Sequence, residues 1–444
     1  MPTETIGTAA LPWADIQGLI LRGYSHPKAR HFVLQFPNAA AGQKLVAALV
    51  PIVTTGQPWG LKPRWCINVG FTADGLRTLG LTVSLANNFP QEFIDGAIKR
   101  AQTLTGPNNN LGDTGDSAPE HWLLSLGTAG AAHAILSAWA IDDAARDAVT
   151  EKVDALLASS GTKSLGSHDA DDLPMSFVHF GYRDGISQPN IDGAPMKKHG
   201  LDTQPLVATG EFVTGYPNQS GTTMPVPLSA KFGTNGCYSA FRILEQNVAA
   251  FFAYVDAHAK QLGIDPGVIQ ANFCGRETDG TPLATHTGPG LNNFDYSDDP
   301  SGTKCPYDAH IRRNHPRNSL GFGPPPPPPK QAGEGYRHRV LRRALPYGPP
   351  WDPAHPDHDK RGLIGHFMGA SLAQQFEFVT TQWTNGVTVA NNHDDALIGA
   401  NTPSGRLQMA NGTILAGFAR FTLTRGSAYL FFPSITALGT LTGT

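Results

Sequence analysis

A repeated alternation between strand-like and helix-like runs restricts the folds open to this chain. Phe32, Leu34 and Phe36 alternate with other side chains, as on one face of a strand. Residues 45–50 follow the period of a helix, and residues 65–71 alternate again. Strands that alternate with covering helices indicate a layered α+β protein and exclude a helix bundle.

The second half of the chain shows a similar order of elements. Residues 238–244 predict a strand, residues 245–262 a helix and residues 372–383 a further helix. Residues 421–432 predict a hairpin that turns at Arg425-Gly426. The two halves share this order of elements without a clear sequence repeat.

Size and composition exclude several functional classes. With 444 residues the chain can bury a large core, and this length predicts two domains. Its net charge of -3 favours neither nucleic acid nor an anionic membrane as a partner. Neither a secretory signal nor an apolar run long enough to span a membrane is visible, so we expect a cytoplasmic protein. No CxxC pair occurs among the four cysteines, which argues against a zinc site or a disulfide framework and favours a reducing compartment. The run Pro324–Pro329 predicts a stiff polyproline II spacer.

Five segments carry recognisable motifs in a fixed order. The three central ones are Gly181–Gly185 (GYRDG), residues 309–317 and residues 340–348. They resemble the GxxDG, proximal-histidine and distal-arginine segments of the dye-decolorising peroxidases. Residues 15–21 and 425–434 resemble the opening and the closing segment of the same family. The resemblance therefore covers most of the chain.

The resemblance implies a fold and an activity. The expected fold is α+β, with two ferredoxin-like domains that each consist of an antiparallel sheet covered by helices. Residues 1–205 would carry the GxxDG motif, and residues 206–444 would bind the haem. The expected activity is that of a haem peroxidase that reduces hydrogen peroxide through a high-valent iron-oxo intermediate and oxidises dyes, phenolics or similar donors. One haem b per chain is expected, and the oligomeric state is left open.

His310 is the expected axial ligand, because haem iron is commonly held by a neutral imidazole. His315 is its rival, although Pro316 restricts the backbone there. A ligating imidazole usually donates its other N–H to an acceptor. By resemblance to a family helix that acceptor is Glu377. The alternatives Asp394 and Asp395 stay open.

Asp184 and Arg342 are the expected catalytic residues. A carboxylate can move a proton from one peroxide oxygen to the other if it reaches the bound peroxide. A fixed cation would stabilise the negative charge that develops on the leaving oxygen. The family register selects Arg342, and a slip by one residue would exchange it with Arg343.

Further side chains are expected to bind the cofactor or to carry electrons. A haem propionate needs cationic partners, and we expect them among the arginines beside His310, above all Arg312 and Arg317, with Arg313 as the alternative. Tyr347 is a possible surface electron relay. Its rivals are Trp351 and Trp383.

One segment departs from the family pattern. Residues 362–369 resemble a strand that lines the distal pocket, where family members often carry an aromatic residue near the place of Gly365. A glycine there would widen the pocket, and His366 would then be able to face the haem edge.

Two other functions compete with the peroxidase. One is a haem-binding or haem-trafficking protein with little turnover, which would need neither Asp184 nor Arg342. The other is a metal-dependent hydrolase that uses His355, His358 and Asp359, or His393 and Asp394. Those clusters match no familiar metal-ligand spacing.

Overall fold

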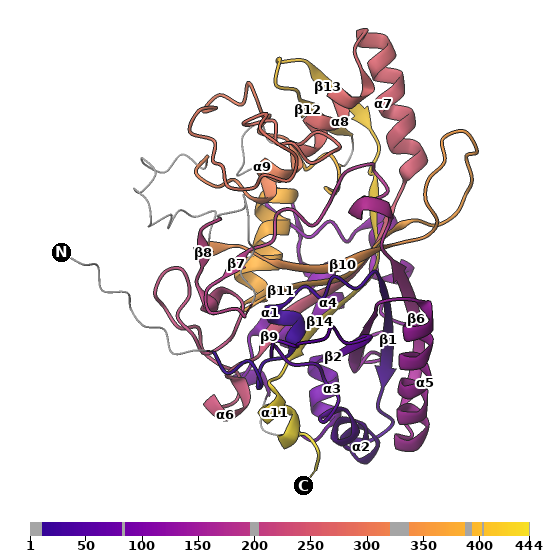
Figure 1. The fold of residues 1–444 in the computed structure, drawn as a ribbon, viewed down its shortest axis with the longest axis vertical. Coiled ribbons are helices and arrows are strands. Elements are labelled where there is room, and N and C mark those ends of the chain that lie inside the picture. The colour runs from indigo at the N-terminus through magenta and orange to yellow at the C-terminus, as the bar shows by residue number, and fades with distance from the viewer. Residues whose placement is uncertain are drawn as a thin grey trace, which may run out of the picture.

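One antiparallel sheet of eight strands forms the centre of the molecule (Figure 1). The computed structural model describes residues 11–81, 85–195, 204–319, 337–386, 393–401 and 404–443. Along the sheet the strands follow the order β10-β11-β9-β14-β2-β5-β1-β6. Their bounds are β1 Lys28–Gln35, β2 Trp65–Phe71, β5 Ala134–Ala140, β6 Lys163–Asp171, β9 Cys237–Gln246, β10 Leu341–Tyr347, β11 Gly362–Gly369 and β14 Thr422–Phe432.

The sheet consists of two half-sheets with the same topology. Numbered along the chain within each half, both β2-β5-β1-β6 and β10-β11-β9-β14 have the order 2-3-1-4. This is the strand order of a ferredoxin-like unit, so the expected fold class is confirmed. The halves meet where β14 pairs with β2 through Phe431 and Phe71. The division at residues 205 and 206 stays a prediction, because strands from both parts share one sheet.

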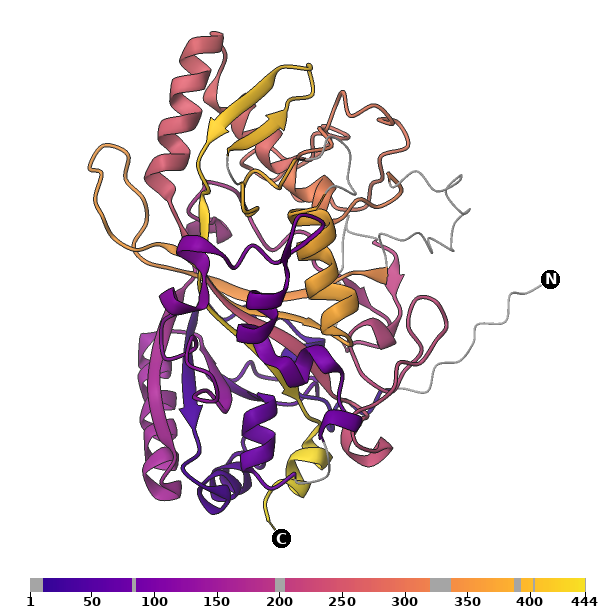
Figure 2. The ribbon, with the colours of Figure 1, turned by 180° about the vertical axis from the view of Figure 1, so that it is seen from behind.

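Two helices cover the first half-sheet. Helix α2, Ala39–Leu49, begins where the Asn38 side chain accepts a hydrogen bond from the third residue of the helix. Helix α5, Asp143–Ser160, is capped in the same way by Asp142 and ends at Gly161, which has a φ of 78°. The two helices pack on each other, and α5 also contacts β1, β2 and β5. Figures 1 and 2 show this half in the lower part of the molecule.

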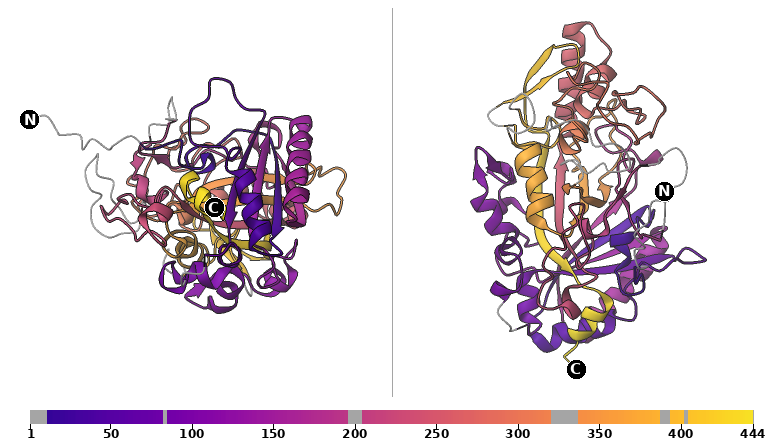
Figure 3. Two further views of the ribbon diagram at one scale, coloured as in Figure 1. Left: turned by 90° about the horizontal axis from the view of Figure 1, so that it is seen from below. Right: turned by 90° about the vertical axis from the view of Figure 1, so that its left-hand side faces the viewer.

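The second half is covered by helices that carry the site. Helix α7 spans Val248–Leu262, α8 spans Pro266–Cys274 and α9 spans His310–Asn314. A longer helix with π geometry consists of η6, Leu372–Glu377, and η7, Val379–Thr384. It lies along the sheet against β9 and β11 (Figure 3, right). Helices with π geometry are rare and occur frequently at functional sites.

Four expectations from the sequence can be compared with these elements. The strand at 238–244 and the helix at 372–383 are confirmed. The helix expected at 245–262 begins only at Val248, because Glu245 and Gln246 still belong to β9. The hairpin at 421–432 is wrong. Strand β14 runs through this segment, and the register with β9 shifts between Thr424 and Gly426. An extra residue in a strand produces such a bulge, and its glycine resembles a turn in the sequence.

The other α-helices and strands complete the fold. Their bounds are α1 Gly18–Leu21, α3 Ala73–Thr78, α4 Gln91–Thr103, α6 Ala230–Gly233, α11 Ile435–Thr440, β3 Thr105–Gly106, β4 Asn109–Asn110, β7 Asn190–Ile191, β8 Leu206–Val207, β12 Gly405–Gln408 and β13 Ile414–Phe418. None of the helices in the described ranges is both long enough and apolar enough to cross a membrane. The expected spacer at Pro324–Pro329 lies outside the described residues. The four cysteines are buried free thiols, in line with the expected absence of a disulfide framework.

Candidate active site

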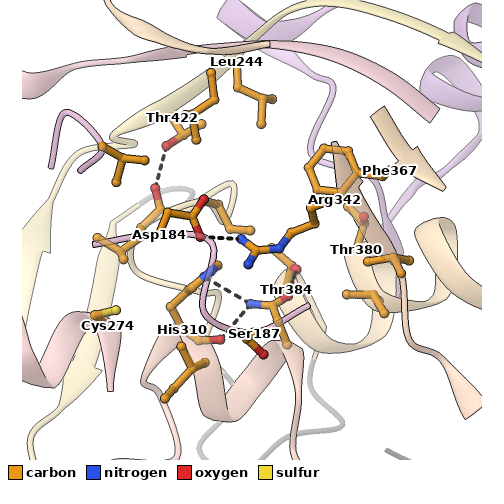
Figure 4. A pocket seen from close by; sticks show the side chains of 18 of the residues that line it. Asp184, Ser187, Leu244, Cys274, His310, Arg342, Phe367, Thr380, Thr384 and Thr422 are labelled. Carbon is orange, nitrogen blue, oxygen red and sulfur yellow. Dashed lines mark hydrogen bonds and ion pairs between the residues drawn. The ribbon is translucent and has the colours of Figure 1, made fainter. Parts of the chain in front are cut away.

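A large cavity lies between the second half-sheet, the π-helix and the Gly181–Gly185 loop (Figure 4). Its empty volume, including the open mouth, is about 1680 Å³. Mostly apolar pockets with a few convergent polar groups are the usual binding sites for small molecules and cofactors. Most of its wall is apolar. The apolar side chains come from the loop, the sheet and the helix and include Ile186, Leu244, Leu363, Phe367, Phe376 and Val379.

The Gly181–Gly185 loop presents Asp184 to the cavity. Gly181 and Gly185 have φ values of 82° and 78°, which a residue with a side chain adopts only at a cost. The N–H of Asp184 donates to the Ser176 carbonyl at 2.9 Å and fixes the start of the turn. The two glycines therefore let the chain reverse tightly on both sides of the carboxylate.

Arg342 reaches Asp184 from strand β10. Its Nη1 lies 3.1 Å from Oδ1 of Asp184 (Figure 4). The Asp184 side chain is 42% exposed, and it faces the cavity. Partial desolvation inside the cavity would raise the pKa of Asp184, but the charge of Arg342 and a hydrogen bond from Gly185 hold that pKa below its ordinary value. The carboxyl group is therefore ionised and can accept a proton.

Arg343, the rival of Arg342, points away from the cavity. Its Nε donates to the Leu19 carbonyl at 2.7 Å, and the side chain is buried. Successive side chains of a strand point to opposite faces. The register expected from the sequence therefore places Arg342, and not Arg343, beside Asp184.

Gln188 holds the backbone of Arg342 in place, and sequence reasoning missed it. Its Oε1 accepts from the Arg342 N–H at 3.2 Å, and its Nε2 donates to the Arg342 carbonyl at 3.1 Å. The amide thus bonds to β10 as a neighbouring strand would. Because Gln188 lies four residues after Asp184, it also fixes the Asp184 loop relative to Arg342.

His310 lines the cavity from the first position of α9. Its Nδ1 lies 2.8 Å from Oδ2 of Asp395, which is fully buried. The same oxygen accepts from Nδ2 of Asn314 at 2.7 Å. Backbone N–H groups of Leu397 and Ile398 donate to the other oxygen at 2.9 and 3.1 Å. Burial alone would raise the pKa of Asp395, but the hydrogen bond with His310, the charge of Arg313 and the hydrogen bond from Ile398 keep that pKa below the ordinary value. A carboxylate on Nδ1 fixes the tautomer and leaves the Nε2 lone pair for a ligand.

The expected acceptor Glu377 is wrong, and its rival Asp395 is the partner of His310. Glu377 is the residue after Phe376, and the two side chains point in different directions from the π-helix. Phe376 lines the cavity, whereas the Glu377 carboxylate accepts from Arg100 at 2.7 and 2.8 Å and from the hydroxyl of Tyr429 at 2.9 Å. Glu377 therefore makes no contact with His310.

His315 lines the same cavity but differs from His310 in its partners. Its Nε2 lies 3.1 Å from Nη1 of Arg339, a cation that can only donate. Burial lowers the pKa of His315 well below its ordinary value, so the ring is neutral. The lone pair of Nε2 is therefore engaged by the guanidinium of Arg339. The geometry favours His310 as the ligand.

The expectation that Arg312 and Arg317 bind a propionate is wrong, because both guanidinium groups are used elsewhere. Buried Arg312 donates to Asp299 and to the Cys305 carbonyl. Arg317 donates to the Asn292 and Phe294 carbonyls and to the Asn292 side chain. Their alternative Arg313 donates to the Trp383 and Gly386 carbonyls. Other arginines line the cavity, among them Arg183 and Arg339, and Arg339 lies beside His315.

Glycine at position 365 does not widen the cavity. A Cβ there would lie 2.1 Å from the Arg343 carbonyl oxygen, so glycine is required by the close pairing of β10 and β11. Phe367, two residues later, supplies an aromatic ring to the cavity wall. His366 faces the opposite side of the sheet, where its two ring nitrogens bond to Ser137 and Ser239. The expectations for both residues are therefore wrong.

The possible relay residues lie outside the cavity wall. Tyr347 ends β10, is 7% exposed and packs its ring edge-on against His168 with centroids 4.6 Å apart. Trp383 is buried in the core, and Trp351 is partly buried. A relay role for Tyr347 stays a prediction.

The clusters proposed for a hydrolase are not assembled. His355 pairs with Asp352 in an exposed loop, and His393 pairs with Asp308. Across the part of the chain that the structure describes, no group of three or more His, Cys, Asp or Glu side chains could hold a metal ion. The residues that line the cavity fit a haem better. They offer the imidazole of His310 with its Nδ1 bonded to Asp395, an apolar wall for the porphyrin, and arginines that could pair with the haem propionates.

Replacement of Asp395 tests the support of His310. We expect Asp395→Asn to weaken haem binding by about 10–100-fold, the usual effect of losing the partner of a ligating histidine. The amide keeps the shape of the carboxylate but not its charge, so the imidazole becomes less basic. Titration of the apoprotein with haem measures the change. Equal affinity in Asp395→Asn and the wild type would contradict the assignment, whereas Glu377→Gln should have little effect on that affinity.

Known peroxidases resemble this chain in sequence and in structure. It is 27% identical over 479 residues to a dye-decolorizing peroxidase of Exidia glandulosa, covering 99% of this chain and 89% of the relative. It is 28% identical over 427 residues to the multifunctional dye peroxidase DyP2 of Amycolatopsis sp. (strain ATCC 39116 / 75iv2), covering 85% and 82%. A crystal structure of a fungal DyP-type peroxidase from Auricularia auricula-judae superposes with a TM-score of 0.82 at 25% identity and covers 98% of this chain and 100% of the other. A dye-decolorizing peroxidase in complex with 2,6-dimethoxyphenol superposes with a TM-score of 0.81 at 25% identity, with 97% and 100% covered. No family model matches the chain.

Proposed function

The chain belongs to the dye-decolorising peroxidase family, and on this premise we propose that it binds one haem b and uses it to reduce hydrogen peroxide while oxidising phenols or dyes. The observation that carries the proposal is the Asp184–Arg342 pair, which faces the same cavity as His310. A protein that only binds or transports haem needs His310 and an apolar wall. It does not need an ionised carboxylate beside a fixed cation.

His310 and Asp395 hold the cofactor in this proposal. Nε2 of His310 would be the ligating atom, because Nδ1 is bonded to Asp395. The bound haem supplies the redox centre that reduces peroxide and takes electrons from the reducing substrate. Arg183 and Arg339 line the cavity and would pair with the propionates.

Asp184 and Arg342 move the proton and stabilise charge. The ionised Asp184 accepts a proton from one peroxide oxygen and returns it to the other, which leaves as water. Arg342 keeps its positive charge throughout and lies on the side of the carboxylate where negative charge develops. Gln188 fixes the Arg342 backbone relative to Asp184, so the two groups act in one geometry.

The reducing substrate is proposed by chemical class. One structural neighbour was solved with 2,6-dimethoxyphenol, and we propose a phenol of this kind as a donor here. Tyr347 is the proposed relay for donors too large to enter the cavity. The four free thiols support a cytoplasmic location as part of the proposal.

Steady-state turnover tests this function. Haem-loaded protein should oxidise 2,6-dimethoxyphenol only when hydrogen peroxide is present, and one haem per chain should give full activity. Protein that binds haem but oxidises no donor with peroxide would overturn the proposal in favour of a binding protein.

The reaction with peroxide should persist into acid. It requires ionised Asp184, so its rate falls as the pH falls through the pKa of that carboxyl. The ordinary pKa of an aspartate is about 3.9, and Arg342 holds that of Asp184 lower. We therefore expect a constant rate down to about pH 4 in the wild type. Arg342→Leu removes that charge, so the pH at which the rate falls should rise by about 1–3 units. A rate that falls at the same pH in both proteins would contradict the pairing of Asp184 with Arg342.

A further inference from the structure

Glu377 is part of a buried network that the proposed mechanism does not use. The hydroxyl of Tyr429 donates to Oε1 of Glu377 at 2.9 Å. Arg100 donates to both carboxylate oxygens, with Nε 2.8 Å from Oε1 and Nη2 2.7 Å from Oε2. Tyr429 is 2% exposed and Glu377 is 4% exposed. A tyrosine hydroxyl thus bonds to a carboxylate where bulk water does not reach it.

A single aromatic ring separates Tyr429 from the cavity. The rings of Tyr429 and Phe376 have centroids 6.0 Å apart and planes at 82°, an edge-to-face contact. Phe376 lines the cavity, and Arg242 lies over its ring at 5.5 Å. Tyr429 lies on β14, the strand whose Thr422 and Thr424 also line the cavity. An electron can therefore pass between Tyr429 and a group in the cavity through one packed side chain.

The partner of the hydroxyl determines whether this tyrosine can be oxidised. A buried phenol that loses an electron and keeps its proton becomes a buried cation, which is costly. Tyr429 avoids this state, because its proton can move along the existing hydrogen bond to Glu377. Once Glu377 is neutral, Arg100 still has Asp95 at 3.9 Å and is 22% exposed. The network thus tolerates the change of charge.

Two other tyrosines show which feature is specific to Tyr429. Tyr182 lines the cavity itself, but its hydroxyl donates at 2.9 Å to the Gln270 carbonyl, which does not take up a proton. Tyr238 is equally buried on β9, and no acceptor for its hydroxyl is found among the described residues. Of these three, Tyr429 alone combines contact with the cavity wall and a carboxylate acceptor.

We propose that Tyr429 is a redox-active tyrosine that stores one oxidising equivalent, with Glu377 as its proton acceptor; this rests on the proposed peroxidase function. One electron leaves the Tyr429 ring through Phe376 and reduces the haem that peroxide has oxidised. The phenolic O–H bond breaks, the proton goes to Oε1 of Glu377, and a neutral phenoxyl radical remains. When a reducing substrate returns one electron, the proton moves back and the O–H bond forms again. The oxidising equivalent is thus kept inside the protein until a donor arrives.

Freeze-quench electron paramagnetic resonance tests this proposal. The full-length, haem-loaded protein is mixed with one equivalent of hydrogen peroxide without a donor, and the Soret band is followed in parallel. We expect a tyrosyl signal in the wild type that narrows when tyrosine is ring-deuterated. It should be lost in Tyr429→Phe and strongly reduced in Glu377→Gln, which still accepts a hydrogen bond but takes up no proton. The matched controls Tyr182→Phe and Tyr238→Phe should keep the signal.

The outcomes separate this inference from the function on which it rests. A Soret response without a tyrosyl signal in the wild type, or a signal that persists in Tyr429→Phe, would overturn the role of Tyr429 and leave the peroxidase intact. A Soret band that peroxide leaves unchanged would contradict both the role of Tyr429 and the proposed peroxidase function. Slower formation of the radical in deuterated water, measured on the wild type, gives a test that needs no substitution, and equal rates in both solvents would contradict proton transfer to Glu377.

Discussion

Replacing His310 by alanine should abolish stable haem binding, whereas the same change at His315 should leave a haem-loaded protein. His310 offers Nε2 to the cavity while Asp395 holds Nδ1 at 2.8 Å. Loss of only the supporting partner costs about 10–100-fold in affinity, so loss of the ligand itself should exceed about 100-fold. His315 is expected to matter less, because its Nε2 already bonds to Arg339. Haem titration followed by the Soret band measures both affinities.

The comparison contains its own control. Both variants remove an imidazole from the same cavity wall, so a general loss of packing would affect them alike. A normal Soret spectrum in His310→Ala together with haem loss in His315→Ala would show that His315 is the ligand. Exogenous imidazole should restore a haem spectrum to His310→Ala, because the space left by the side chain opens into the cavity.

Asp184→Asn and Arg342→Leu should each keep haem and react with peroxide about 10²–10⁴-fold more slowly, the usual contribution of a positioned acid–base group. Asparagine cannot take up the proton. Leucine removes the charge that lies 3.1 Å from the carboxylate. Stopped-flow absorption after mixing with peroxide gives the rate constants. Because the two groups act as a pair, the rate constant of the double variant should fall by less than the product of the two single-variant reductions.

A matched control is available in the same wall. Ser187 is polar and lines the cavity three residues after Asp184. We expect Ser187→Ala to react with peroxide at nearly the wild-type rate. Rates equal to wild type in both Asp184→Asn and Arg342→Leu would contradict their assignment, and a loss in Ser187→Ala of the same size would show that the cavity tolerates no change.

The motifs in the sequence were sufficient to select the residues that touch the cavity. Asp184, His310 and Arg342 stand in short segments with fixed neighbours, and strand alternation separates Arg342 from Arg343. The acceptor of His310 could not be found in this way, because it lies 85 residues along the chain. Asp394, Asp395 and Glu377 all follow α9 in plausible contexts, and only the fold shows that Glu377 points to Tyr429.

Burial and strand pairing explain the other differences between expectation and structure. Arg312 and Arg317 look like surface cations beside His310 in the sequence, but both are buried and donate to carbonyl groups of the segment before α9. Arg425-Gly426 looks like a turn, yet it forms a bulge inside β14. At Gly365 the sequence suggested extra space in the cavity, whereas the glycine is needed for the contact between two strands. In each case the role of the residue depends on contacts that the local sequence pattern does not reveal.

The reaction of the haem-loaded protein with one equivalent of hydrogen peroxide, followed by stopped-flow absorption, tests the central claim most directly. The account predicts a rapid loss and shift of the Soret band that a phenolic donor reverses. A normal haem spectrum that peroxide leaves unchanged would contradict it, since the Asp184–Arg342 pair would then serve no reaction at this cavity.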